Sequence, residues 1–376
     1  DVQNYICDVI RFWVSEFDVD GIRLDAADVL DFDFMRMLRR TAEEVKPDFW
    51  LMGEVIHGDY SRWVNGETLH SVTNYALHKA LYSGHNDHNY FEIAHTVKYL
   101  QNMGNLDLYN FVDNHDVERI YTKLSNKAHF TPVHILLYTL PGVPSIYYGS
   151  EFGIEGRKER SSDDSLRPAL SLDDYETALG DNPCTALIAA LGQIRQHTPA
   201  LSYGSYAELH LTNRQFAFAR DLNDVRVVVT VNNDDNAASM DLPAGNAVEY
   251  IGALSGQKVA VQDGRINVTV PANSGEIWVP AGDMPEYKPF KVEISVKEET
   301  VTDEESMPAD SEAPSSATEP VHFDPNKSPE DMSVAELQST ILAKMANNGP
   351  VSDQMKKTVN ENIWHDSLVN WLKSFR

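Results

Sequence analysis

Three acidic residues of this chain stand where a predicted β-strand ends. Asp25 closes the run GIRLD, Glu54 closes LMGE, and Asp116 follows NFVDNH. The carboxyl ends of parallel strands in a barrel converge on one face, so acids far apart in the sequence can meet there. Crowded carboxylates repel one another, and a cluster of three favours a chemical role over a stabilising one. The spacing therefore predicts a site built from carboxylates.

Two neighbouring side chains fit the same chemistry. Arg23 lies two residues before Asp25, on the same face of the strand, where its charge would hold Asp25 ionised. An ionised carboxylate is suited to nucleophilic attack on an anomeric carbon, and His115 is suited to hydrogen bonding a sugar hydroxyl. In the alternative interpretation, Arg23 is half of a structural ion pair and His115 is a loop histidine.

The elements that would position these residues alternate between strands and helices from about residue 18 to 200. Short apolar runs predict strands at GIRLDA, FWLMGEV, SVTNY, LYNFVDNHD and PSIYYGS. Helical spacing predicts an amphipathic opening helix and further helices at 34–45, 74–100 in two pieces broken near Gly84, and 183–196. This order is typical of an α/β fold with a parallel sheet.

The pattern changes after residue 200. Short alternating strands, among them FAFAR, VRVVVTVNN, AVEYIG, INVTV and GEIWVP, predict a small antiparallel β-domain. Residues 298–320 hold eight acids and no Lys or Arg, which is the composition of a disordered linker. We expect four parts: a catalytic part at 1–200, a β-domain at 201–285, the linker at 286–331 and a helical tail at 332–376.

The tail pattern consists of two helical stretches. Ser333 and Glu336 form a capping box ahead of the first, and Trp364, Trp371 and Phe375 mark one face of the second. We interpret the tail as a small helical module that docks on itself or on the catalytic part. A partner-binding helix is the alternative, because an aromatic stripe also suits a groove on another protein.

Composition excludes several kinds of partner. The chain has 376 residues, 42% of them hydrophobic, and its 57 acidic against 31 basic residues give a net charge of −26. Such a charge disfavours nucleic acid and anionic membranes, and no apolar run approaches the roughly 20 residues of a membrane-spanning helix. The two cysteines, Cys7 and Cys184, are too few for a disulfide framework, and we expect both to be buried and reduced.

The motifs GIRLDAA, GEV and FVDNHD, in this order and at these separations, resemble conserved regions of the α-amylase family of glycoside hydrolases. GVPSIYYGSEFGIEG resembles the eighth-strand segment of that family, and the region after it resembles the family's C-terminal β-domain. The resemblance covers about residues 1–285. It implies a (β/α)8 TIM barrel, present here in part as strands 4 to 8, followed by an antiparallel β-domain and, outside the resemblance, the helical tail.

By this resemblance Asp25 is the nucleophile, Glu54 the general acid and base, and Asp116 the group that stabilises an oxocarbenium-like transition state. Arg23, His115 and Asn114 would bind substrate or orient the acids. The roles agree with a retaining mechanism, which needs one ionised and one protonated carboxyl group about 5 to 5.5 Å apart. Glu54 follows Leu51 and Met52, and an apolar surround would keep it protonated.

The chain departs from the family at several points. The family's first conserved region and first three strands have no counterpart, so we expect an N-terminally truncated chain. That region supplies an Asn ligand for a structural calcium, so we assign no metal ligand and no cofactor, with calcium as the alternative. The Lys-His pair that many amylases carry three residues after the nucleophile is replaced by Asp28 and Val29.

The expected activity is retaining hydrolysis of α-1,4-glucosidic bonds in starch, glycogen or maltooligosaccharides. The alternatives are neopullulanase-like α-1,6 hydrolysis or transglycosylation within the family and, in another class, an inactive amylase-like interaction subunit. A sugar-binding module on the β-domain would need exposed aromatic residues, and Tyr250 and Trp278, its candidates, alternate as core residues do. We expect a cytoplasmic protein, from its two reduced-looking cysteines and the absence of starch-binding repeats.

Overall fold

A computed structural model describes residues 1–282 together with Leu337, Thr340 and Ile341. Contacts within the chain divide it into two compact units, Asp1–Glu293 and Ile294–Arg376. The expected acidic linker and nearly all of the expected tail lie outside the described residues. Leu337 and Ile341, two apolar positions of the first expected tail helix, are helical and buried.

Five short parallel strands run through the first part of the larger unit. They are β1 (Gly21–Leu24), β2 (Trp50–Gly53), β3 (Ser71–Val72), β4 (Tyr109–Asn110) and β5 (Val143–Pro144). β1 pairs with β2, β2 with β3, and β4 with β5. An isolated parallel bridge between Thr73 and Tyr109 joins the two groups. All five strands predicted from the sequence are therefore present, in the expected order and parallel.

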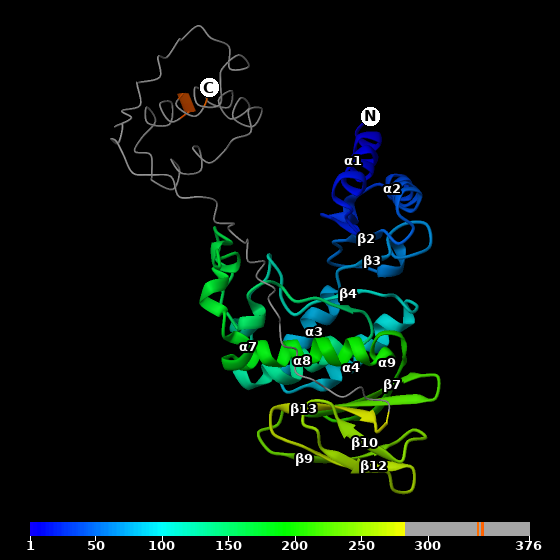
Figure 1. The fold of residues 1–376 in the computed structure, drawn as a ribbon, viewed down its shortest axis with the longest axis vertical. Coiled ribbons are helices and arrows are strands. Elements are labelled where there is room, and N and C mark those ends of the chain that lie inside the picture. The colour runs from blue at the N-terminus through cyan, green and yellow to red at the C-terminus, as the bar shows by residue number, and fades with distance from the viewer. Residues whose placement is uncertain (283–336, 338–339, 342–376) are drawn as a thin grey trace, which may run out of the picture. The chain divides into compact units, whose positions relative to one another are not determined.

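Helices connect and cover these strands, as Figure 1 shows. The longer ones are α1 (Val2–Phe17), α2 (Phe32–Val45), α3 (Tyr75–Asn86), α4 (Tyr90–Asn102), α6 (Phe130–Thr139) and α8 (Pro183–His197). Short α-helical turns are α5 (Ile120–Lys123), α7 (Ala178–Asp181) and α9 (Pro199–Tyr203). The 3-10 turns are η1 (Ala27–Val29), η2 (Tyr60–Arg62), η3 (Lys127–His129), η4 (Ser150–Phe152), η5 (Asp164–Leu166) and η6 (Leu172–Tyr175).

Local sequence explains where several helices begin. The Asp31 side chain accepts a hydrogen bond from the Phe34 backbone N–H and caps α2, and Asn182 caps α8 ahead of a proline at its first turn. The predicted break near Gly84 falls slightly later, where α3 ends at Asn86. The opening helix is confirmed, and its buried residues are Cys7 and Ile10.

The antiparallel region holds eight strands in two sheets. A six-stranded sheet has the order β11-β10-β13-β8-β7-β6, and β12 pairs with β9 separately. The strands are β6 (Ser205–Leu211), β7 (Gln215–Leu222), β8 (Val225–Asn232), β9 (Ala238–Pro243), β10 (Glu249–Gly252), β11 (Lys258–Ala260), β12 (Arg265–Val270) and β13 (Ser274–Pro280). The sequence did not predict β6, β9 or β11.

The core of this region settles one alternative interpretation. Tyr250 and Trp278 are buried, and the Trp278 indole N–H donates to the Thr230 hydroxyl at 3.1 Å. Both residues pack into one hydrophobic cluster with strands of the two sheets. They are therefore core residues and offer no stacking surface for a sugar.

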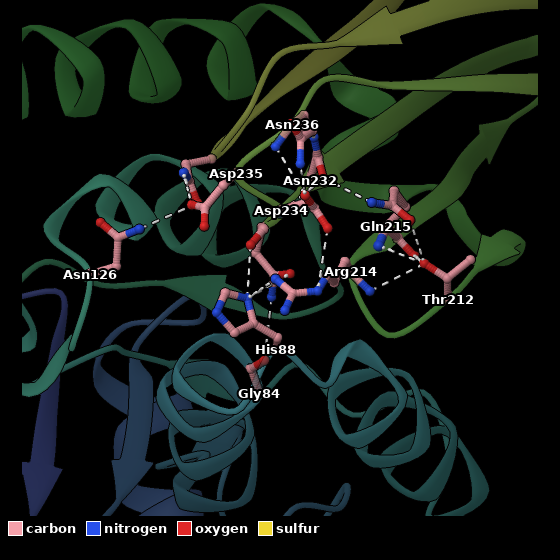
Figure 2. Close-up of polar contacts among 12 residues, drawn as sticks. Gly84, His88, Asn126, Thr212, Arg214, Gln215, Asn232, Asp234, Asp235 and Asn236 are labelled. Atoms are coloured by element: carbon pink, nitrogen blue, oxygen red, sulfur yellow. Dashed lines mark hydrogen bonds and ion pairs between the residues drawn. The ribbon is translucent and has the colours of Figure 1, made fainter.

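The helices and the antiparallel strands share a continuous core. One hydrophobic cluster includes residues of α3, α4, α6 and α8 together with residues of β7, β8 and β13. A polar seam adjoins it, drawn in Figure 2: His88, in the turn between α3 and α4, lies beside Arg214 and Asp234. Its Nδ1 atom is 2.9 Å from the Asn233 carbonyl oxygen. Apolar packing and polar contacts thus hold these elements as one unit.

Candidate active site

The carboxyl ends of β1 and β2 place two of the predicted acids side by side. Leu24 and Gly53 are partners in the parallel register, so the next residues, Asp25 and Glu54, follow adjacent strand ends. The Glu54 backbone N–H donates to the Leu24 carbonyl at 2.9 Å. A Cβ atom on Gly53 would come within 2.5 Å of Leu69, so close packing at this strand end excludes a side chain.

One guanidinium group joins the two acids. Arg23 Nη1 lies 2.8 Å from Asp25 Oδ1, and Arg23 Nη2 lies 3.0 Å from Glu54 Oε2. The Asp25 side chain is 79% exposed and the Glu54 side chain only 12% exposed, so one carboxylate faces solvent while the other is largely covered. A shared cation offsets the repulsion between the two acids and fixes their relative orientation.

The surroundings of Glu54 differ from the apolar surround expected. Leu51 and Val55 are buried, but they pack into the hydrophobic cluster that includes α2. The carboxyl group instead meets polar partners: Arg23, the Ala26 backbone N–H at 3.2 Å, and the Tyr75 hydroxyl at 3.5 Å. Alternation along the strand end explains this result, because successive side chains point to opposite faces.

A tyrosine connects this pair to the third acid. Tyr75, the first residue of α3, donates toward Glu54 and accepts a hydrogen bond from Asn114 Nδ2 at 3.0 Å. Asn114 Oδ1 in turn accepts from the Asp116 backbone N–H at 2.8 Å. Burial raises the pKa of Tyr75, so its hydroxyl stays protonated and able to donate. Both ends of the Asn114 amide thus contact protein atoms, which gives it a role in shaping the loop after β4.

Asp116 has two side-chain partners. His115 Nε2 lies 3.2 Å from its Oδ2 atom, and Arg167 Nη2 lies 2.9 Å from its Oδ1 atom. The Asp116 side chain is 36% exposed. Arg167 was not singled out in the sequence, because it lies 51 residues from Asp116 in a segment without strand or helix periodicity.

Three aromatic side chains, Trp63, Tyr147 and Tyr148, differ in exposure. Trp63 is buried against Phe32, Tyr147 is half-buried, and Tyr148 is 43% exposed. The buried Arg119 guanidinium lies over one face of the Tyr147 ring, 4.1 Å from its centroid, and this contact fixes the ring. Tyr148 is therefore the one member of this trio with an exposed ring.

The described residues contain no group of three or more His, Cys, Asp or Glu side chains that could hold a metal ion. Within the same residues, Cys7 is buried and Cys184 half-buried, and both are free thiols. The expectation of full burial was therefore wrong for Cys184.

Family models match two stretches of the chain. The α-amylase catalytic domain model matches residues 1–187, and the α-amylase C-terminal domain model matches residues 204–278. The chain belongs to the α-amylase family of glycoside hydrolases. The family match agrees with the resemblance inferred from the motifs around the three acids.

Curated relatives of the family align over most of the described region. A cyclomaltodextrinase of Thermoanaerobacter pseudethanolicus is 30% identical over 62% of this chain and 40% of its own length. Neopullulanase 2 of Thermoactinomyces vulgaris is 28% identical over 74% of this chain and 48% of its own length. The chain thus spans less than half the length of these two relatives.

Solved structures share the fold. An α-amylase from Anoxybacillus is 23% identical with a TM-score of 0.66, over 74% of this chain and 62% of that one. A cyclomaltodextrinase structure gives the same TM-score and identity, over 74% of this chain and 48% of that one. The five parallel strands with their helices are therefore part of a TIM barrel, and the antiparallel strands form the C-terminal β-domain of the family.

Proposed function

We propose that this chain carries the catalytic carboxylates of a retaining α-glucan hydrolase. The observation that carries the proposal is the shared guanidinium: Arg23 contacts Asp25 at 2.8 Å and Glu54 at 3.0 Å. The two acids come from adjacent parallel strands, at the barrel face where TIM-barrel enzymes place their active sites. Asp116 joins them through Tyr75 and Asn114.

The exposed acid, Asp25, and the covered acid, Glu54, have different roles in this mechanism. Asp25, exposed and paired with Arg23, attacks the anomeric carbon as a carboxylate and forms a β-glycosyl ester. Glu54 gives its proton to the leaving oxygen, then takes a proton from the water that cleaves the ester, so that both acids return to their starting states. Asp116 stabilises the positive charge that develops on the sugar ring.

The substrate class is supported by the relatives. The names cyclomaltodextrinase, neopullulanase and maltogenic α-amylase all describe enzymes of α-glucans. We propose α-1,4-linked maltooligosaccharides and cyclomaltodextrins as first substrates, with pullulan as the test of neopullulanase activity. No helix among the described residues is long and apolar enough to cross a bilayer. A cytoplasmic location is supported by a relative named intracellular maltogenic amylase from Bacillus subtilis.

The experiment measures reducing ends released from maltoheptaose, β-cyclodextrin and pullulan, and the anomer first formed by proton NMR. We expect turnover with α-configured products from the unchanged chain and at least a thousandfold loss in Asp25→Asn. Asp20→Asn is the matched control, because Asp20 precedes the same strand, is 91% exposed and pairs with Lys46. Full activity in Asp25→Asn would exclude Asp25 as the nucleophile. A chain that binds maltoheptaose without turnover would favour the inactive interaction subunit.

A further inference from the structure

A segment after β5 reaches back over the end of β4. We call residues 156–170 the rim segment. It is anchored to Arg119, which is fully buried: the Arg119 backbone N–H donates to the Gly156 carbonyl at 3.0 Å, and Arg119 Nη2 donates to the Leu166 carbonyl at 2.8 Å. Arg119 therefore fixes the segment at two points ten residues apart, one through its backbone N–H and one through its guanidinium group, and the exposed residues between them are held near Asp116.

Arg167 of the rim segment contacts the side chain of the third acid, Asp116, and the backbone of the residue before it. Its Nε atom donates to the His115 carbonyl at 3.0 Å, while Nη2 donates to Asp116 Oδ1 at 2.9 Å. Lys158, from the same segment, donates to the Asp116 carbonyl oxygen at 2.8 Å. Asp163 Oδ2 lies 3.3 Å from the same Nη2 atom and adds a second carboxylate contact to the guanidinium.

These contacts leave Asp116 little rotational freedom. Arg167 holds one carboxylate oxygen and His115 Nε2 lies 3.2 Å from the other. A planar guanidinium that donates from two different nitrogens fixes an angle as well as a distance, which a single ammonium group does not do. The contacts of Arg167 and His115, one to each carboxylate oxygen, thus set the direction in which the carboxylate points.

We infer that Arg167 is a positioning residue for Asp116. The inference rests on the proposed function, in which Asp116 stabilises charge on the sugar ring. Such stabilisation depends on a group that is already oriented before the charge develops. Arg167 is 46% exposed and contacts Asp116 and the rim segment rather than the two acids on β1 and β2. Its loss should therefore slow the chemical step and leave substrate affinity nearly unchanged.

The test compares Arg167→Gln and Arg167→Lys with Arg157→Gln as the matched control. Arg157 lies on the same segment, is 78% exposed, and its Nε atom lies 3.8 Å from Glu118. We expect Arg167→Gln to lower kcat on maltoheptaose about tenfold to a hundredfold with KM changed less than about threefold. The kcat of Arg167→Lys should stay well below that of the unchanged chain. The kcat of Arg157→Gln should equal that of the unchanged chain.

Three kinetic results would overturn the inference. They are equal rates in Arg167→Gln and Arg157→Gln, a change confined to KM, and full recovery in Arg167→Lys. A crystal structure of Arg167→Gln supplies a readout that does not need turnover. If the unchanged chain hydrolyses nothing, the proposed function fails, but the crystal structure of Arg167→Gln still tests the positioning role. A rotated Asp116 side chain supports that role, and an unmoved one contradicts it.

Discussion

Ser150 donates a hydrogen bond to the buried carboxylate of Asp113 at 2.7 Å. This contact joins the segment between β4 and Asp116 to the turn after β5. The same Asp113 oxygen accepts from the Ile120 backbone N–H at 2.7 Å. The other oxygen, Oδ1, is buried without a partner among the described residues. One acid thus organises the loop that presents Asp116, although it faces no solvent.

The first prediction concerns the charge of Asp113. Burial raises its pKa to about 6, so the folded protein holds this proton more tightly than the unfolded chain, and the contribution to stability is present at low pH and lost as pH rises from about 4 to 6. Asp113→Asn keeps the shape and removes the charge. We expect it to raise the free energy of unfolding by about 1 to 2 kcal/mol at pH 8.

The difference between Asp113→Asn and the unchanged chain should shrink at pH 4.5, where the carboxyl group is protonated in the folded protein. Urea unfolding at the two pH values measures it. A pH-independent difference would show that packing or hydrogen bonding, and not ionisation, separates the two proteins.

The second prediction concerns buried histidines. Burial lowers the pKa of His85 to about 3 and that of His134 to about 4. A depressed histidine pKa means that the unfolded chain binds the proton first, so stability is present above about pH 6.5 and is lost as pH falls toward 4. We expect each residue to add a slope of about 1.4 kcal/mol per pH unit across that window.

Melting temperatures between pH 7 and 4.5 test this slope in His134→Gln and in His95→Gln. His95 is exposed on α4 and serves as the control. The pH dependence should weaken in His134→Gln and stay unchanged in His95→Gln. Identical slopes in all three proteins would assign the acid sensitivity to other groups.

The third prediction concerns the buried Arg220 of β7. It donates to the Thr139 carbonyl at 2.7 Å and twice to the Gly204 carbonyl, at 2.8 and 3.1 Å, so it ties the end of α6 to the antiparallel sheet. Arg220→Met removes these donors from the buried Thr139 carbonyl and from the part-buried Gly204 carbonyl. We expect a loss of about 2 to 4 kcal/mol in the free energy of unfolding.

Arg265→Met is the comparison for Arg220→Met, because Arg265 is 45% exposed and pairs with Asp241 on the surface. Its loss should cost less than about 1 kcal/mol. Denaturant unfolding of the two variants measures both values. Equal costs would mean that the buried guanidinium adds no more than a surface pair.

The fourth prediction separates the proton donor from the other acids. Glu54→Gln keeps the size of the side chain but has no proton to give. We expect hydrolysis of maltoheptaose to slow by about a hundredfold to ten-thousandfold, because its leaving oxygen needs protonation. An α-maltosyl fluoride, whose leaving group needs no proton, should lose much less. Equal slowing of both substrates would contradict the acid role.

The sequence alone determined the strand order and the family. Each of the three acids follows an apolar run, so strand and acid are read together from a local pattern, and the five predicted parallel strands are present. The pairing of Arg23 with Asp25 is also local, because residues two apart in a strand share a face. β6, β9 and β11 were missed because cross-strand pairing and packing fix a strand more than its own composition does.

Tertiary structure alone decided which distant side chains meet the acids. Arg167 reaches Asp116 across 51 residues, and Ser150 reaches Asp113 across 37, and no local sequence pattern pairs these residues. It also decided that the carboxyl group of Glu54 faces Arg23, Ala26 and Tyr75 rather than an apolar wall. Hydrogen bonds and ion pairs act over a few ångströms in space, so a linear pattern specifies the elements, and only their packing specifies the partners.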